Sequence, residues 1–269
     1  TDHAIFIASD SSNYSYGSMN IVYVDISDPN GDMRKRGSFD VRGTIQDEFK
    51  MDYYNGYLRI CTHEWTEEGG LSRLYIYDVT DPDAPVETGS LELAKGEQLF
   101  ATRFDGERAY MVTFEQKDPL WVIDLSDPAA PEIKGELIVP GWSTYIRPAG
   151  DHLVALGVDD TNPNQNLVSV SLFNVADPAN PTLTDRVSFG EEDGWSWSTA
   201  SEDVKSLTIL EDIGLIILPY TTSYNSDHGY VSENRLQLIN YSPSDLVPRG
   251  WVAQKGNVIR GTVYSDRLF

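Results

Sequence analysis

Four short runs typical of β-strands fill residues Phe100–Pro140, FATRFDGERAYMVTFEQKDPLWVIDLSDPAAPEIKGELIVP. Each run is apolar and rich in β-branched or aromatic residues, and Gly, Pro and Asp separate one run from the next. The predicted strands are Leu99–Phe104, Arg108–Phe114, Leu120–Leu125 and Glu132–Val139. Four consecutive strands joined by short turns form an antiparallel meander, which is the unit of one β-propeller blade.

A strand followed by a turn recurs five times along the chain, at Ile21–Pro29, Leu74–Pro82, Leu120–Pro128, Val170–Pro178 and Leu236–Ser244. An Asp or Asn ends each strand and is expected to accept hydrogen bonds from the backbone ahead of it, while Pro fixes φ at the first corner. A Gly follows the turn in most copies (Gly37, Gly89, Gly135, Gly250), and Asp185 takes its place in the fourth. Such repetition predicts copies of one structural unit.

The whole chain is therefore predicted to be an all-β propeller of four-stranded antiparallel blades, because no segment shows a sustained helical period. The strand Ala4–Ala8 lacks an inner neighbour, and Val258–Tyr264 near the C-terminus supplies one. Joining them closes the first blade and gives five blades in a single domain, Thr1–Phe269. The predicted blades are residues 256–269 with 1–41, then 42–93, 94–140, 141–190 and 191–255.

The composition is that of an acidic globular protein, with 42 Asp and Glu against 20 Lys and Arg and a net charge of −22. Such a charge repels nucleic acids and anionic membranes, and no apolar run is long enough to span a bilayer. We therefore expect neither a nucleic-acid partner nor membrane insertion. The single cysteine, Cys61, is predicted to be a small buried core residue.

The longer links of a propeller gather on one face, where they are expected to form a ligand site. The links between second and third strands are predicted at Ser11–Ser18, His63–Gly70, Glu115–Asp118, Asp159–Asn166 and Thr221–Asn234. The links between blades are predicted at Gln46–Lys50, Lys95–Gln98, Gly141–Tyr145 and Gly190–Lys205.

Aromatic and charged residues alternate in these links, as at Trp195, Trp197 and Lys205. Exposed aromatics beside hydrogen-bonding groups can stack on sugars or anchor a protein, although Trp and Tyr also fill gaps between blades. An inner-strand arginine faces either the central channel or an acid such as Glu97. The candidate ligand-binding residues are Trp142, Tyr145, Arg147, Glu97, Arg103 and Lys205.

Acidic links offer Asp159, Asp160 and Asp227 as candidate metal ligands, but they match neither an EF-hand nor a glycine-rich calcium repeat. Calcium is the one metal considered, and no other cofactor is expected. The histidines lie at no zinc-binding spacing, and the chain has no Gly-x-Ser-x-Gly motif. The sequence therefore favours a protein without catalytic activity.

Segments Asp47–Thr62, Leu93–Pro148, Val170–Pro181 and Val258–Phe269 resemble, in this order, an uncharacterised family of secreted bacterial and archaeal proteins. Those proteins carry a C-terminal β-propeller domain distantly related to WD40 repeats. The resemblance covers nearly the whole chain and implies export and attachment near the cell surface, but no established activity. Where the family has Asp-His-Lys before a strand, this chain has Glu202-Asp203-Val204-Lys205, so only Asp203 or Lys205 could correspond.

Three hypotheses for function follow. The first is a non-catalytic module of an exported or cell-surface protein that binds a protein or glycan through the long-link face. The second is a carbohydrate-active hydrolase or lyase with carboxylates at the channel mouth. The third is a self-assembling structural subunit of a surface layer or filament.

Overall fold

The structure is a computed structural model that describes residues 1–10, 17–67, 69–93, 95–114, 118–162, 164–191, 193–265 and 267–269. The predicted links Ser11–Ser18 and Glu115–Asp118 lie largely outside these residues. The chain divides into two compact units. The first unit comprises Thr1–Gln116 and Leu120–Gly135, and the second comprises Lys117–Pro119 and Glu136–Phe269.

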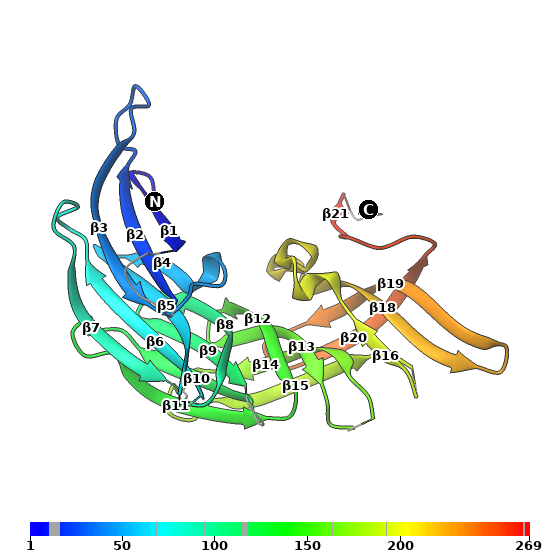
Figure 1. Cartoon of the computed structure of the whole chain (residues 1–269). Helices are drawn as coiled ribbons and strands as arrows, with labels where there is room; N and C mark the ends of the chain where they lie inside the picture. Colours follow the sequence, from blue (N-terminus) through cyan, green and yellow to red (C-terminus); the bar gives the residue numbers. More distant parts are fainter. Residues whose placement is uncertain are drawn as a thin grey trace. The chain divides into compact units, whose positions relative to one another are not determined.

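Antiparallel sheets follow one another along the first unit (Figure 1). Strands β1 (Ala4–Asp10), β2 (Ser18–Asp25) and β3 (Arg34–Arg42) form one sheet. The 3-10 turn η1 (Glu48–Lys50) leads into a sheet of β4 (Met51–Tyr54), β5 (Tyr57–Thr66), β6 (Gly69–Asp78) and β7 (Val86–Leu93). A further sheet consists of β8 (Gln98–Asp105), β9 (Arg108–Phe114), β10 (Asp118–Asp124) and β11 (Glu132–Val139).

The second unit begins with a sheet of β12 (Trp142–Ala149), β13 (His152–Asp159), β14 (Leu167–Asn174) and β15 (Thr182–Phe189). The next sheet has the order β16 (Trp195–Trp197), β18 (Leu215–Ser226), β19 (Gly229–Tyr241) and β20 (Leu246–Gln254), and β17 (Thr208–Leu210) also pairs with β18. Along the chain, the 3-10 turns η2 (Thr199–Ser201) and η3 (Val204–Ser206) precede β17, and η4 (Glu211–Ile213) follows it. In the described part of the chain, no helix has the length and apolar character needed to cross a membrane.

The strands predicted in the central stretch are confirmed. Strands β9 and β11 have the predicted bounds, and β8 and β10 differ from them by one or two residues at each end. Two predicted links are wrong, because His63–Gly70 and Thr221–Asn234 mostly extend the hairpins β5–β6 and β18–β19. Their Thr, Trp, Tyr and Val residues favour extended backbone, so pairing continues almost to the turn.

The two chain ends lie in different sheets of different units. Strand β1 pairs with β2, and β21 (Val263–Tyr264) pairs with β22 (Arg267–Leu268) in a short C-terminal hairpin. The predicted pairing of Val258–Tyr264 with Ala4–Ala8, which would close the first blade, is not among these pairings. It remains a prediction, as do the number of blades and their boundaries.

The repeated turns use the hydrogen bonds expected from their sequence. Asp78 Oδ1 accepts bonds from the Thr80 backbone nitrogen at 2.9 Å and from Thr80 Oγ1 at 2.6 Å. Asn174 replaces Asp in the fourth copy and still accepts from the Ala176 nitrogen at 2.9 Å. Such bonds hold the backbone in the turn and do not themselves require a charge. The same pattern recurs at Asp25, Asp28, Asp81, Asp124, Asp127 and Asp177.

We expect Asp78→Asn to weaken stability at neutral pH and to become equivalent to the parent protein in acid. Hydrogen bonds from the Thr80 side chain and backbone lower the pKa of Asp78. Its stabilising contribution is therefore complete above about pH 4, the pKa of an unfolded chain, and is lost as the pH falls through the folded pKa. Urea unfolding at intervals from pH 7 toward pH 3 measures this difference, and a constant gap across that range would contradict the expectation.

The repeated glycine marks a close contact between neighbouring sheets within the first unit. Gly37 of β3 donates its backbone N–H to the carbonyl of Pro82, beyond β6, at 2.7 Å. A Cβ on Gly37 would lie 2.6 Å from that oxygen, and a Cβ on Gly89 of β7 would lie 2.3 Å from the carbonyl oxygen of Pro128. Because real side chains do not approach so closely, these two turns can pack against the outer strand of the preceding sheet only where that strand has a glycine.

The fourth copy makes the corresponding contact with a side chain. Asp185 of β15 accepts a hydrogen bond from the Leu246 nitrogen, at the start of β20, through Oδ2 at 2.7 Å. Where Gly37 contacts the next sheet through its backbone N–H, Asp185 does so through its carboxylate, again between an outer strand and the turn of the following sheet.

Apolar residues pack between the sheets of each unit. In the first unit Phe39 stacks on Tyr77 with ring centroids 3.9 Å apart, and a neighbouring cluster contains Cys61, Leu74 and Met111. In the second unit a cluster that includes Leu156, Ile216 and Ile239 joins the sheets of β12–β15 and β16–β20. Burial of apolar surface on both faces of a sheet explains why these strands show little alternation.

Cys61 is expected to be unreactive in the native protein. Its side chain is fully buried, its sulfur lies 3.9 Å from that of Met111, and burial raises the pKa of the thiol. Since the thiolate is the reactive species, Ellman's reagent at pH 8 should label the chain only after denaturation. Rapid labelling of one thiol under native conditions would contradict the buried position.

Candidate functional site

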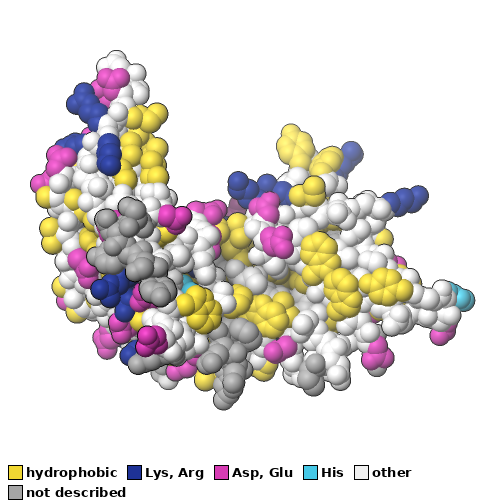
Figure 2. All heavy atoms as spheres, viewed as in Figure 1, with side chains coloured by type: hydrophobic (Ala, Val, Ile, Leu, Met, Phe, Trp, Pro, Cys, Tyr) yellow, Lys and Arg dark blue, Asp and Glu magenta, His cyan; other side chains and the backbone are white. Residues whose placement is uncertain are grey.

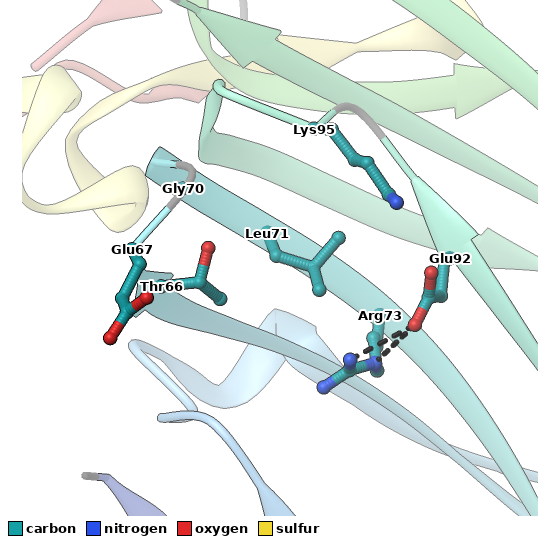
Figure 3. A pocket seen from close by; sticks show the side chains of 7 residues that line it. All are labelled: Thr66, Glu67, Gly70, Leu71, Arg73, Glu92 and Lys95. Atoms are coloured by element: carbon teal, nitrogen blue, oxygen red, sulfur yellow. Dashed lines mark hydrogen bonds and ion pairs between the residues drawn. The ribbon is translucent and has the colours of Figure 1, made fainter.

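A cavity of about 300 Å³ opens at one end of the β4–β7 sheet (Figure 3). The end of the β5–β6 hairpin and the link after β7 form it, so it lies where the sequence predicted the segments His63–Gly70 and Lys95–Gln98 to gather. The lining residues are Thr66, Glu67, Gly70, Leu71, Arg73, Glu92 and Lys95.

Close glycine packing joins the two segments that form this pocket. The Gly96 nitrogen donates to the Gly70 carbonyl at 2.7 Å. A Cβ on Gly69 would lie 3.2 Å from the Gly96 Cα, and one on Gly70 would lie 2.6 Å from the Glu97 carbonyl oxygen. Gly69 and Gly96 also have φ values of +108° and +90°, a region that suits glycine. The link that carries Lys95 can therefore lie directly against the end of the hairpin.

Arg73 forms the charged wall of the pocket. Its Nε and Nη2 donate to Glu92 Oε1 at 3.1 and 2.9 Å, and its Nη1 donates to Glu64. Burial alone would lower the pKa of Arg73, but the hydrogen bond to Glu92 and nearby negative charges outweigh it and raise the pKa. Lys95 and Glu67 take no part in this ion pair, so the mouth of the pocket presents one charge of each sign.

His63 precedes Glu64 on β5 and therefore points to the opposite face of the sheet from the pocket. It is 4% exposed, its Nδ1 lies 3.4 Å from Ser72 Oγ, and burial lowers its pKa. Its Nε2 has no hydrogen-bond partner among the described residues. This histidine is thus a buried residue between sheets and not part of the pocket wall.

Two of the predicted ligand-binding residues lie in the first unit. Glu97 directly precedes β8, and its carboxylate accepts a hydrogen bond from Thr113 Oγ1, which in turn accepts from Trp121 Nε1 at 2.9 Å. Arg103 of β8 lies over the ring of Phe49, with its guanidinium carbon 3.9 Å from the ring centroid. Glu97 adjoins the pocket through Gly96, whereas Arg103 is not among the residues that line it.

A β-bulge places three other predicted residues on one face of β12. The register pairs Trp142 with Val158, Tyr145 with Leu156 and Arg147 with Val154, with a shift between Ser143 and Tyr145. Because side chains opposite alternate residues of β13 share a face, the extra residue brings Trp142 onto the side of Tyr145 and Arg147.

That face of β12 points toward the neighbouring sheet of the second unit. Tyr145 packs against the buried cluster that includes Leu156, and Arg147 Nη2 donates to Glu211 Oε1 at 3.1 Å. Lys205 lies elsewhere, in η3, which Asp203 caps by accepting from the Lys205 nitrogen at 3.0 Å. The structure therefore brings Trp142, Tyr145 and Arg147 together but places Lys205 on a different element.

The candidate metal ligands lie on two elements of the second unit. Asp159 accepts from Thr161 through Oδ1 and from Ser188 Oγ through Oδ2 at 2.6 Å, and Asp160 follows it in an exposed loop. Asp227 occupies the turn between β18 and β19. Within the residues that the structure describes, no three His, Cys, Asp or Glu side chains are grouped to hold a metal ion. Calcium binding remains an untested prediction.

Comparison with models of known protein families shows the family to which this chain belongs. A model described as a β-propeller domain matches residues 1–266. The chain belongs to the β-propeller domain family. The predicted all-β propeller with four-stranded antiparallel sheets is thereby confirmed.

Similar propeller sequences occur in two archaea. The chain is 36% identical over 253 residues to an uncharacterised protein of Methanocaldococcus jannaschii. The aligned region covers 92% of this chain and 37% of that protein. It is 31% identical over 241 residues to an uncharacterised protein of Archaeoglobus fulgidus. This aligned region covers 88% of this chain and 34% of that protein. The propeller thus spans little more than a third of the length of these relatives.

Among solved structures, the propeller is similar to the crystal structure of the Vanderwaltozyma polyspora Nup133 β-propeller domain. The comparison covers 98% of this chain and 79% of that one, at 9% identity and a TM-score of 0.43.

Proposed function

We propose that this propeller is a non-catalytic binding module of an exported or cell-surface protein, which engages a protein or glycan partner through the link end of its sheets. The pocket beside Arg73 is the observation that carries the proposal. Its volume of about 300 Å³ is at the lower end of the range for ligand pockets, which suits one side chain or one sugar of a larger partner. Lys95 and Glu67 at its mouth offer a donor and an acceptor.

The chemistry of the pocket favours binding over hydrolysis. A glycosidase requires two carboxylates available as acid and as base or nucleophile. Arg73 already engages Glu64 and Glu92, so Glu67 is the one lining carboxylate among the described residues that lies outside this ion pair. A rigid scaffold that carries such a site on its links is a common arrangement for recognition. The proposal of export is supported by the family resemblance and by an acidic composition that favours solubility.

Arrays of glycans and of peptides, probed with the purified chain, test this function. Lys95 belongs to no ion pair among the residues that the structure describes, so Lys95→Glu reverses the charge at the pocket mouth without breaking one of these pairs. Lys255→Glu is the matched control outside the pocket. We expect specific signals that fall at least tenfold in Lys95→Glu and persist in Lys255→Glu. Equal signals from both variants, or none from the parent protein, would exclude this site.

The same samples distinguish the two alternative functions. Mass spectrometry of the glycans after incubation detects cleavage, which would favour a carbohydrate-active enzyme. Light scattering over a range of concentrations detects ordered self-association, which would favour a structural subunit.

A further inference from the structure

Two tryptophans of the edge strand β16 expose their indole rings. Trp195 is 45% exposed and Trp197 is 40% exposed, although Trp side chains are usually mostly buried. Figure 2 shows large hydrophobic side chains gathered on the surface over β16 and β18. An exposed apolar group of this kind commonly marks a binding surface.

Ser196, the residue between them, fixes the direction of both rings. Its Oγ accepts from the Val168 nitrogen at 2.8 Å and donates to the Phe189 carbonyl, and its backbone nitrogen donates to the Asn166 carbonyl at 3.1 Å. These bonds attach one face of β16 to the neighbouring sheet. Because side chains alternate along a strand, both indoles lie on the other face, with Cα atoms about 7 Å apart.

Uncharged polar side chains continue this face across the sheet. The register places Thr221 opposite Trp197, Asn234 opposite Thr221 and Gln254 opposite Asn234. Thr221 Oγ1 donates to Asn234 Oδ1 at 2.7 Å, which orients the side-chain amide of Asn234 and leaves its NH₂ group as a donor. The row thus combines an aromatic surface with hydrogen-bonding groups.

The charge of this row identifies the chemistry of its ligand. The chain has 42 acidic and 20 basic residues, yet none stands in the row from Trp197 to Gln254. Although Arg260 lines a cavity together with Gln254, the row itself provides no ion pair for a charged partner. It matches a neutral ligand with apolar ring faces and many hydroxyl groups.

We propose that Trp195 and Trp197 stack on sugar rings of a neutral polysaccharide while Asn234 and Gln254 hydrogen-bond its hydroxyls. The inference rests on the proposed binding function and assigns a ligand class to a second surface, separate from the pocket beside Arg73. Each indole offers a rigid apolar face at little cost in conformational entropy, and two neighbouring rings contact one chain at two points.

Affinity electrophoresis in native gels that contain hydroxyethylcellulose, galactomannan or soluble starch tests the proposal. The variants are Trp195→Ala/Trp197→Ala and, as a matched control, Trp65→Ala, which removes a 67% exposed tryptophan of the first unit. We expect at least one polysaccharide to retard the parent protein and Trp65→Ala. The double alanine variant should bind at least tenfold more weakly, and Trp195→Phe/Trp197→Phe should retain part of the affinity.

Thermal melts show whether each variant is folded, and acrylamide quenching of tryptophan fluorescence supplies a readout in the parent protein itself. Bound polysaccharide should protect the exposed indoles from the quencher. No retardation by any of the three polysaccharides overturns the proposal, as does equal retardation of the double alanine variant. Equal array signals from Lys95→Glu and Lys255→Glu, together with polysaccharide retardation that the double alanine variant loses, would reject the pocket and leave this surface standing. Loss of array signals in Lys95→Glu without retardation by any polysaccharide would reject this surface alone.

Discussion

Replacement of Gly89 by alanine is expected to destabilise the protein by about 3 kcal/mol, the upper part of the range for overpacked sites. The new methyl group would lie 2.3 Å from the Pro128 carbonyl oxygen and 3.1 Å from Pro131 Cδ. Both obstacles belong to a turn that Asp127 already fixes by accepting from the Ala129 nitrogen at 2.9 Å. Neither can move without separating β7 from the following sheet. Equilibrium unfolding in urea, followed by circular dichroism, measures the loss.

Gly256→Ala is the matched control for this substitution. A Cβ on Gly256 meets no heavy atom within 4 Å, and the residue does not have a positive φ. Removing a glycine also reduces the freedom of the unfolded chain, so this variant should remain within about 1 kcal/mol of the parent protein. Equal unfolding midpoints for Gly89→Ala and Gly256→Ala would show that the sheets do not meet at Gly89.

Arg235→Ala is expected to cost about 2–3 kcal/mol, because it leaves two carboxylates without their cation. The Arg235 side chain is 7% exposed, and it pairs with Glu191 at 2.7 Å and with Glu233 at 2.6 Å. Its guanidinium also lies 4.1 Å from the ring centroid of Trp251. The two glutamates are 37% and 35% exposed, so water compensates part of the loss and the effect falls below that of a fully buried pair.

Arg147→Ala provides the comparison with an exposed ion pair. Arg147 lies 3.1 Å from Glu211, with side chains 42% and 46% exposed, so its removal should cost less than about 1 kcal/mol. Urea unfolding of both variants at low and at high salt separates the two situations. A loss in Arg235→Ala no greater than in Arg147→Ala would mean that solvent reaches the Arg235 cluster freely.

The candidate site was only partly accessible from the sequence. The segments His63–Gly70 and Lys95–Gln98 were predicted to lie at a functional face, and they do border the pocket. The one candidate ligand-binding residue within them, Glu97, adjoins the pocket but is not among its lining residues. Nothing in the sequence singles out Arg73 and Glu92, because they belong to strand interiors, where the sequence indicates only extended backbone. Their pairing depends on the register of β6 and β7.

The three residues of β12 illustrate the same limit. A regular strand would place Trp142 and Tyr145 on opposite faces, since they are three positions apart. The bulge between Ser143 and Tyr145 reverses this expectation, and the register with β13 shows it only in the folded sheet. Bulges arise where backbone pairing and side-chain packing compete, so local sequence rarely specifies them.

The sequence by itself determined the strands, the turns and the repeat, because each depends on contacts within a few residues. The Asp and Pro of each turn and the short apolar runs between turns act locally, and the structure retains the turn hydrogen bonds at Asp78 and its equivalents. Tertiary structure alone decided which side chains meet across sheets: the glutamates on Arg73, the indoles beside Thr221, and the carbonyl that excludes a side chain at Gly89. Those contacts join residues distant in the chain, and their geometry is set only when the sheets pack against one another.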